Sequence, residues 1–574
     1  MKKVLMIAAE NDAISGAKVG GMADVIRDLP PALASEDIIV DVAMPNYGYI
    51  AQTYNANNIG TVAVKFGANI EIVSVALMPR PRTSVDGNTY LNSQVYLFEH
   101  HLFNSEGNQV YCAGSNDRPF ADDATKFALF NLAVAQAYID GLIPEVDVMH
   151  MHDWHAGMLV MLRAFDPQYA MLKQCQCVFS IHNLALQGIR PIRDDVSSFA
   201  AWFPELTHLL TDEQKAHLSD PRYPNCVNPM KMGIELSDKV HLVSPTYAHE
   251  VLMASDHQNG FFGGEGLEAS MLDKHNRGDI VGILNGCVYE NDNSGVNDSG
   301  VNDSGVNDSD VNSAESELTT AKPDKKTANK SINQLLVKSQ DTVIKWLGKT
   351  DSARSVDQIT LARLQQWQMQ QINQASSIDF LMTSVGRLTD QKVLLLRQPY
   401  PVEANSTGQS LLDAMLIELK RLKPQGVFML LGSGYHVIAK EFQQVASRHS
   451  NFVFINGYDQ QLSDELYQLG DLFVMPSSFE PCGISQLLAM KQGQVCIAHG
   501  VGGLRDTIKD QQTGWLFEGH NLAHQAEQFI QVLINALSLS NEQPEQYRQM
   551  EIAASQERFS WQQVAKQYRQ QLYS

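Results

Sequence analysis

Short apolar runs rich in β-branched residues alternate with amphipathic stretches along two separate lengths of this 574-residue chain. A run of four to eight such residues between turn signals is typical of a buried strand. In the first half these runs lie at 4–9, 38–44, 146–151, 177–181 and 239–243, and in the second half at 380–385, 427–431, 452–456 and 472–476. Several intervening stretches have helical spacing, as in Met22, Val25, Ile26 and Leu29. The alternation predicts two α/β domains, each built on a parallel sheet.

The composition of the chain limits the classes of partner that it can bind. The chain is too long for one hydrophobic core, and its 44% hydrophobic and 19% charged residues are typical of a globular protein. A net charge of -21 opposes binding to nucleic acid or to an anionic membrane, since both need a basic face. A few convergent Lys and Arg residues can still make a local pocket for a small anion. We therefore expect small-molecule partners, no nucleic acid and no membrane.

The first residues are expected to form a strand rather than a leader peptide. Glu10 breaks the apolar run 4–9, which is short for a signal sequence, and no small-residue cleavage site follows. No uninterrupted apolar stretch is long enough to span a bilayer. The seven cysteines include no C-x-x-C pair, so reduced thiols in a cytoplasmic protein are the expected state.

Between the two lengths the composition changes. Residues 293–312 form a pentapeptide repeat, NSGVNDSGVNDSGVNDSDVN, that is too polar to pack and predicts a disordered or loosely looped insert. Calcium is the alternative, but the repeat lacks the EF-hand Gly and terminal Glu, and the calcium-binding β-helix repeat has nine residues. The expected organisation is a domain over 1–286, an insert with a helical linker over 287–375, a second domain over 376–555, and a C-terminal helix over 556–574 that packs back on the first domain.

Polar residues cluster where the predicted strands end, which is where open α/β sheets place their ligands. In the stretch 17–25, Gly20 and Gly21 allow a close backbone approach before a helix whose first amides would face an anion. Lys18 adds a positive charge. Taken alone, the same stretch is equally well read as a tight turn without a ligand.

The stretch HMHDWHAG, 150–157, brings three histidines and Asp153 together in sequence. A metal site is one reading, but His150 and His152 lie on the same face of a strand and no distant motif completes a ligand set. Hydrogen bonding to a hydroxyl-rich ligand is favoured over a metal here. A structural role is favoured for His150.

In a third stretch, 179–188, His182 and Asn183 lie at the start of a loop that follows a predicted strand. These residues either form a turn whose hydrogen bonds are satisfied or are positioned at a reacting sugar or carbonyl.

In the second half, Arg387 and Lys392 follow the strand 380–385, and the planar fork of an Arg together with a mobile Lys suits a diphosphate. Two basic residues in a loop are otherwise simply solvated.

The stretch FEPCGISQLLAM, 479–490, follows the last predicted strand of the second half. The spacing of its apolar residues predicts a helix that starts near Gly483, with free amides pointing back towards Glu480. A further glycine pair, Gly502 and Gly503, opens another predicted helix. Cys482 has no activating base beside it and is read as a packed residue rather than a nucleophile.

Nine motifs in this order resemble the bacterial glycogen synthase and plant starch synthase family, a group of retaining glycosyltransferases. They are KVGGMADV, HDWH, IHNLALQG, NPMKMG, VSPTYA, GILNG, GRLTDQK, FEPCG and VGGLRDT. The resemblance implies the GT-B fold, in which two Rossmann-like domains face each other across a cleft. It also implies transfer of glucose, with retention, from ADP-glucose to the non-reducing 4-hydroxyl end of an α-1,4-glucan.

The resemblance assigns roles to residues of this chain. Lys18 and the Gly20–Gly21 turn would contact the donor phosphates, Arg387 and Lys392 would neutralise the departing diphosphate, and His182 would lie beside the glucosyl ring. Glu480 would accept hydrogen bonds from glucose hydroxyls. The same cleft would be lined by Asp24, His152, Asp153, Asn183, Asn228, Cys482, Gly483, Gly502 and Gly503. Neither a cofactor nor a metal is required, since the two cations would replace a metal ion.

Several positions depart from the family pattern. Ser478 stands where an Arg usually precedes F-E-P-C-G, Leu488 replaces a common Tyr, and the W-N-P signature after 286 is missing. The rival hypothesis is therefore a non-catalytic paralogue that binds glucan or regulates a true synthase. A GT-B enzyme with another sugar or acceptor is a third reading. The sequence leaves open the choice between ADP- and UDP-glucose, and the oligomeric state.

Overall fold

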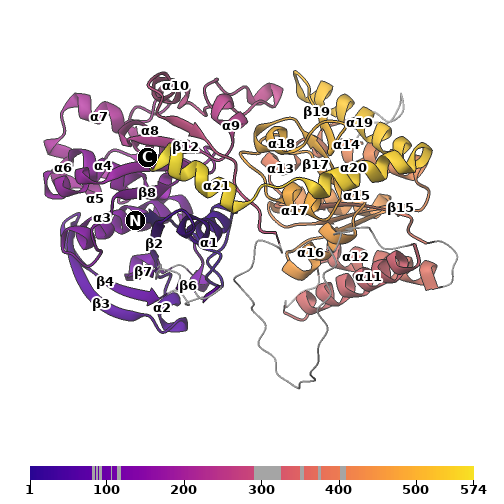
Figure 1. Ribbon diagram of the computed structural model, residues 1–574, viewed down its shortest axis with the longest axis horizontal. Coiled ribbons are helices and arrows are strands. Elements are labelled where there is room, and N and C mark those ends of the chain that lie inside the picture. Colours follow the sequence, from indigo (N-terminus) through magenta and orange to yellow (C-terminus); the bar gives the residue numbers. More distant parts are fainter. Residues whose placement is uncertain are drawn as a thin grey trace. The chain divides into compact units, whose positions relative to one another are not determined.

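A computed structural model describes residues 1–79, 84–85, 88–89, 94–104, 106–112, 118–289, 325–349, 354–372, 377–400 and 409–574. The chain forms two compact units (Figure 1). The first comprises Met1–Ser255, Phe262–Val296 and Phe559–Ser574, and the second comprises Asp256–Phe261 and Asn297–Arg558. The pentapeptide repeat at 293–312 lies outside the described residues, so its predicted disorder stays a prediction.

The first unit is built on a nine-stranded sheet in the order β13-β12-β9-β8-β1-β2-β7-β4-β3. Its strands are β1 Lys2–Ile7, β2 Ile38–Pro45, β3 Asn57–Phe66, β4 Asn69–Pro79, β7 Gln94–Glu99, β8 Val148–His152, β9 Gln176–Ile181, β12 Lys239–Leu242 and β13 Ile280–Gly282. All five strands predicted in the first half are present and belong to the parallel part of this sheet. Their apolar side chains are buried, which is why they read as continuous apolar runs.

The purely parallel sheet predicted for this half is wrong at one edge. β4 pairs antiparallel with both β3 and β7, so the sheet is mixed. β3 alternates buried residues such as Val62 and Val64 with exposed ones. That two-residue period is typical of a half-exposed edge strand rather than of the fully buried runs that the prediction relied on.

Helices pack against the parallel part of this sheet. α1 opens at the predicted glycine turn and buries Met22, Val25, Ile26 and Leu29, as their spacing predicts. The helices of the unit are α1 Gly21–Ala34, α2 Ile50–Thr53, α3 Pro119–Ile139, α4 Gly157–Phe165, α5 Phe199–Trp202, α6 Pro204–Leu209, α7 Asp212–Leu218, α8 Pro229–Leu236, α9 Pro245–Glu250, α10 Glu268–Asn276 and α21 Trp561–Gln567. A small ribbon pairs β10 Arg190–Pro191 with β11 Cys226–Val227.

The C-terminal segment belongs to the first unit. α21 packs against α1, and the chain continues through a short π-helical turn, Tyr568–Leu572, to a buried Tyr573. The Tyr573 hydroxyl lies 2.7 Å from Nδ1 of His150, and the Gln176 side chain donates to the carbonyl of Leu572 at 2.8 Å. The end of the chain is thus fixed by polar contacts as well as by packing.

The second unit contains a six-stranded, all-parallel sheet in the order β16-β15-β14-β17-β18-β19. The strands are β14 Phe380–Val385, β15 Gly426–Leu431, β16 Phe452–Ile455, β17 Leu472–Met475, β18 Val495–His499 and β19 Gly514–Phe517. The four strands predicted in this half are confirmed. The helices are α11 Lys325–Leu347, α12 Ser355–Ile372, α13 Asp390–Val393, α14 Leu411–Leu422, α15 His436–Arg448, α16 Gln460–Leu469, α17 Ser485–Lys491, α18 Gly502–Thr507, α19 Leu522–Glu542 and α20 Pro544–Gln556.

The helical segment before residue 376 is a layer of this unit rather than a surface linker. α11 and α12 lie side by side (Figure 1) and bury Leu335, Leu336, Leu364 and Trp367 against one face of the sheet. The opposite face is covered by helices that include α14 and α19. The segment is rich in Gln and Lys, so its few buried apolar positions are easily overlooked in the sequence.

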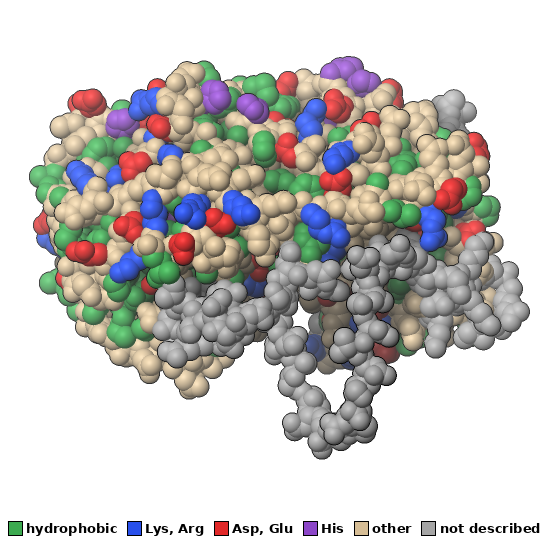
Figure 2. All heavy atoms as spheres, in the orientation of Figure 1, with side chains coloured by type: hydrophobic (Ala, Val, Ile, Leu, Met, Phe, Trp, Pro, Cys, Tyr) green, Lys and Arg blue, Asp and Glu red, His purple; other side chains and the backbone are tan. Residues whose placement is uncertain are grey.

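Charged side chains of both signs are mixed on the face of the molecule that Figure 2 shows. On the face shown in Figure 2, Lys and Arg (blue) and Asp and Glu (red) are interspersed rather than gathered into a single-sign field. Among the described helices, none combines the length and the hydrophobicity of a membrane-spanning segment. None of the seven cysteines, all of which lie in described residues, forms a disulfide.

Candidate functional site

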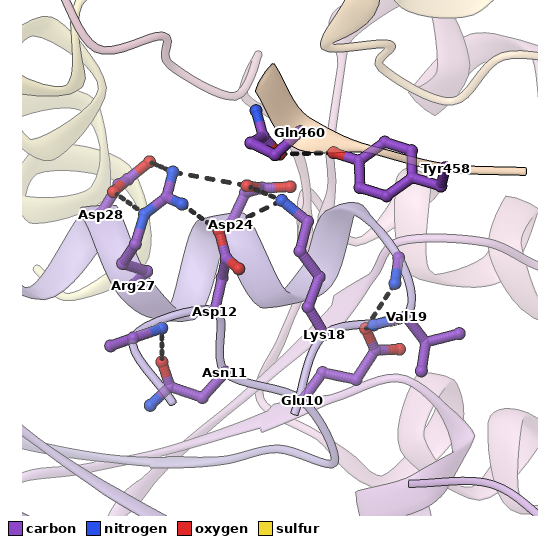
Figure 3. Close-up of polar contacts among 12 residues, drawn as sticks. Glu10, Asn11, Asp12, Lys18, Val19, Asp24, Arg27, Asp28, Tyr458 and Gln460 are labelled. Atoms are coloured by element: carbon purple, nitrogen blue, oxygen red, sulfur yellow. Dashed lines mark hydrogen bonds and ion pairs between the residues drawn. The ribbon is translucent and has the colours of Figure 1, made fainter. Parts of the chain in front are cut away.

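The glycine turn at the start of α1 is a cluster of opposite charges (Figure 3). Lys18 pairs with Asp24 at 2.7 Å and with Asp12 at 3.1 Å, and Arg27 pairs with both of these carboxylates. Burial lowers the pKa of the Lys18 ammonium, but the two carboxylates raise it by more, so Lys18 stays charged. The predicted neighbours Lys18 and Asp24 therefore do meet, at the N-terminus of a 14-residue helix.

Glu10, to which no sequence pattern assigns a role, lies in the same turn. Its carboxylate is buried and accepts from the backbone N–H groups of Val19 at 2.8 Å and Gly20 at 2.5 Å. It also accepts from the Tyr111 hydroxyl at 2.8 Å. Among the amides predicted to face an anion, the Gly20 amide therefore faces a carboxylate of the protein itself. The only hint in the sequence was a charged residue directly after a buried strand.

His152, the last residue of β8, lies beside His182, the first residue after β9. His152 Nδ1 lies 2.9 Å from His182 Nε2, and the two rings stack with centroids 5.3 Å apart. Burial lowers the pKa of His182 to about 3 and that of His152 well below its ordinary value, so both rings are neutral at physiological pH. His152 Nε2 is buried without a partner among the described residues. A proton on His152 Nδ1 leaves only a lone pair unpaired there, which costs less than an unpaired N–H.

Asp153 fixes the loop that carries His182. Its carboxylate accepts the His182 N–H at 2.7 Å and the Asn183 N–H at 3.5 Å. Burial raises the pKa of Asp153 to about 7, even though the two amides oppose the shift. Its backbone has φ of 56°, a left-handed conformation that Asp tolerates better than most residues. Asp153 therefore shapes the site through His182.

Two predicted binding residues serve mainly to hold loops. The Asn183 side chain accepts from the Ala185 N–H at 2.8 Å, which closes a turn. Asn228 is completely buried: its amide donates to Gln187 and Asp220 and its oxygen caps α8. Asn228 does not line open space, which corrects the expectation from the sequence. The fully buried His150 likewise bonds Ser180 and Tyr573, which agrees with its structural reading.

A cavity of about 630 Å³ adjoins the glycine turn within the first unit. It is lined by Gly16, Lys18, Val19, Tyr49 and residues 107–112. Aromatic rings beside amide and hydroxyl groups form the kind of surface that packs against a sugar and bonds its hydroxyls. No group of three or more His, Cys, Asp or Glu residues in the described parts of the chain could hold a metal ion.

In the second unit the structure joins Lys392 to Glu480. The two side chains form an ion pair in which Glu480 is almost fully buried. The loops that carry them are also joined through Gln391, whose side chain donates to Phe479 O at 3.0 Å and whose carbonyl accepts from Ser478 N at 2.9 Å. Motifs 88 residues apart in sequence thus form one site.

The glycine pair of α18 packs directly on the Glu480 loop. A Cβ on Gly502 would lie 2.0 Å from the Glu480 carbonyl oxygen, and one on Gly503 would lie 2.1 Å from that of Cys482. Gly502 also has φ of 45°. Only glycines allow the two loops to approach this closely, so Gly502 and Gly503 set the position of Glu480.

The helix predicted to start near Gly483 is present as α17. The helix begins at Ser485 because Gly483 has φ of 77° and cannot continue the helix. The Gln486 side chain donates to the carbonyls of Cys482 and Gly483 at 3.1 and 2.9 Å. The carboxylate of Glu480 is paired with Lys392 instead of facing free helix amides.

Arg387 is exposed two residues after the end of β14, and within the described residues no hydrogen bond or ion pair engages its guanidinium. It is therefore available for a ligand.

Position 478 is a buried Ser, so the loop before Phe479 lacks the cation that the family pattern places there. Leu488 is partly buried against the core of the second unit, so its replacement of a Tyr is accommodated by packing.

Comparison with known proteins relates both units to glucan-forming enzymes. The family described as starch synthase catalytic domain matches residues 3–272, and the family described as glycosyl transferases group 1 matches residues 409–555. A glycogen synthase of Exiguobacterium sibiricum is 29% identical, with 98% of this chain and 96% of the relative covered. A glycogen synthase of Streptococcus agalactiae is 27% identical, with 100% and 99% covered.

A solved structure shares the fold. The catalytic domain of starch synthase IV from Arabidopsis thaliana, determined with ADP and acarbose bound, has a TM-score of 0.68 and 23% sequence identity. The similarity covers 99% of this chain and 98% of that one. The similarity therefore extends over both units rather than over one of them.

Proposed function

Because this chain belongs to the glycogen and starch synthase family of GT-B glycosyltransferases, we propose that it transfers glucose from ADP-glucose to an α-1,4-glucan. Transfer to the non-reducing 4-hydroxyl would retain the anomeric configuration. The observation that carries the proposal is the joining of Lys392, Glu480 and the Gly502–Gly503 turn into one site, together with family motifs in both units.

The chemistry suits this set of residues. The bond between glucose C1 and the phosphate oxygen breaks, a bond between C1 and the acceptor oxygen forms, and the acceptor proton passes to the departing phosphate. A nucleoside diphosphate is a good leaving group, so charge neutralisation and positioning carry most of the work. Arg387 and Lys392 supply the positive charge, and Glu480 accepts hydrogen bonds from glucose hydroxyls.

The neutral state of His182 fits a place beside the glucosyl ring. The transition state of glucosyl transfer carries positive charge near C1, and a protonated imidazole there would oppose it. Burial keeps His182 neutral at physiological pH, so it can lie against that centre without repulsion. The His152 contact and the Asp153 carboxylate hold it in place.

Glucose transfer to glycogen from ADP-glucose and, separately, from UDP-glucose tests the proposal, with Glu480→Ala as the inactive control. We expect transfer from ADP-glucose and a loss of about 10²-fold or more in the variant. No transfer from either donor by folded protein would overturn the proposal. Glucan binding without turnover would then favour the non-catalytic paralogue, which no observation in the structure supports.

A further inference from the structure

Glu10 occupies a position that the proposed reaction does not use. Its two oxygens take three hydrogen bonds, from the Val19 and Gly20 amides and from the Tyr111 hydroxyl. A carboxylate has about four lone-pair sites, so most of its capacity is used within the protein. Glu10 therefore connects three segments of the first unit: the end of β1, the glycine turn, and the stretch around Tyr111.

The stretch around Tyr111 is itself fixed by a buried ion pair on α3. Lys126 and Asp123 pair at 2.9 Å, with side chains only 1% and 9% exposed. Lys126 also donates to the carbonyl of Val110 at 2.9 Å, and Asp123 accepts from the Cys112 N–H at 3.1 Å. The residues on both sides of Tyr111 are thus anchored.

The Tyr111 ring has support of its own. It stacks on His155, with ring centroids 5.4 Å apart, and His155 is buried. The phenol oxygen is therefore held where it can donate to Glu10. Continuous contacts lead from α3 through Tyr111 and Glu10 to the turn that carries Lys18.

We propose that Glu10 is a positioning residue that sets the conformation of the turn over residues 18–21. By consuming the Val19 and Gly20 amides, it leaves the later amides at the start of α1 to face a ligand. It also fixes the backbone from which Lys18 extends. This changes the expectation from sequence, because the Gly20 amide donates to Glu10 and is not left to bind a phosphate.

The effect on donor affinity rests on the proposed function, whereas the effect on the turn does not. Hydrogen–deuterium exchange across residues 17–22 of the full-length chain measures the turn directly, and the KM and kcat for ADP-glucose measure its consequence. The variants are Glu10→Ala, Glu10→Gln and Tyr111→Phe. Glu71→Ala is the control, since it removes a carboxylate of the same unit that bonds His100 at 3.1 Å.

We expect Glu10→Ala to raise exchange at Val19 and Gly20 about tenfold or more and to raise KM by a similar factor, with a smaller change in kcat. Glu10→Gln keeps an oxygen for the two amides and an N–H group for the Tyr111 oxygen, so exchange and KM should stay within about threefold of wild type. Tyr111→Phe should fall between these variants, and Glu71→Ala should match wild type.

Unchanged exchange in Glu10→Ala would overturn the proposal, whatever the activity. An equal loss in Glu10→Gln and Glu10→Ala would also overturn it, because charge rather than hydrogen-bond geometry would then matter. If Glu10→Ala fails to fold, Glu10→Asp replaces it, since the shorter side chain cannot reach both amides. If the wild type transfers no glucose, the exchange data still decide the role of Glu10, and only the proposed function fails.

Discussion

Each unit opens a helix with a glycine pair after a buried strand, yet the two pairs do different work. At Gly20 an added Cβ would lie 3.8 Å from both Glu10 oxygens, which is an ordinary contact. At Gly502 it would lie 2.0 Å from the Glu480 carbonyl oxygen. The first glycine meets a side chain through its amide and leaves room for a Cβ, whereas the second allows two backbones to touch. The same motif therefore makes different demands in the two units.

Gly502→Ala should give the largest effect. The added methyl group must displace the Glu480 loop, and φ of 45° disfavours any L side chain. We expect transfer to fall about 10³-fold and the free energy of unfolding to fall by about 2–4 kcal/mol. Steady-state kinetics and chemical denaturation measure the two losses. Near-wild-type activity in this variant would remove the distinction between the two turns.

Removing Lys18 from the first unit and Lys392 from the second compares how strongly each turn depends on its ion pairs. Lys392→Ala leaves the nearly buried Glu480 without its partner, so we expect a loss of about 3 kcal/mol in stability and 10²–10³-fold in transfer rate. In Lys18→Ala, Arg27 still pairs with Asp12 and Asp24, so stability should change by less than about 1 kcal/mol and the rate by about tenfold.

Lys392→Met combined with Glu480→Leu separates stability from catalysis in the second unit. Removing both charges should restore most of the stability lost in Lys392→Ala, because no unpaired carboxylate remains. Transfer should stay as low as in the single variant. Recovery of activity in the double variant would show that neither residue takes part in the reaction.

Asp153→Asn tests a pH dependence that only the first unit should show. The loop that carries His182 is held by the Asp153 carboxylate, whereas the loop that carries Glu480 is held by contacts with glycines. Burial raises the pKa of Asp153 from 3.8 to about 7, so the protonated form is favoured in the folded state. Its stabilising contribution is complete below pH 4 and is lost as the pH rises through 7. Between about pH 4 and pH 7, the unfolding free energy of the wild type should fall relative to that of Asp153→Asn by on the order of 4 kcal/mol. Parallel denaturation profiles from pH 4 to 8 would contradict this.

Gly20→Ala should give the smallest effect. The residue has φ of -136°, which L residues adopt readily, and the new methyl group meets Glu10 only at van der Waals distance. We expect less than a threefold change in transfer and less than about 1 kcal/mol in stability. A loss as large as that of Gly502→Ala would show that both turns have the same steric demand.

The sequence alone predicted nine of the parallel strands, the amphipathic face of α1 and the residue types of both candidate sites. Buried strands need apolar runs and helices need a 3.6-residue period, and both patterns are local. The nine ordered motifs also identified the family. These features can be read directly because each depends on residues close together in the chain.

Tertiary structure decided which residues meet. The Lys392–Glu480 pair spans 88 residues, and the Tyr111–Glu10 bond spans 101. Glu10 looked like a strand end, and Asn228 like a ligand residue, because their partners come from distant segments that no local pattern specifies. The antiparallel edge strands and the sheet-covering role of α11 were missed for the same reason, since burial depends on what packs against a segment. The sequence names the candidate residues, and only the fold shows which of them lie together and which hold others in place.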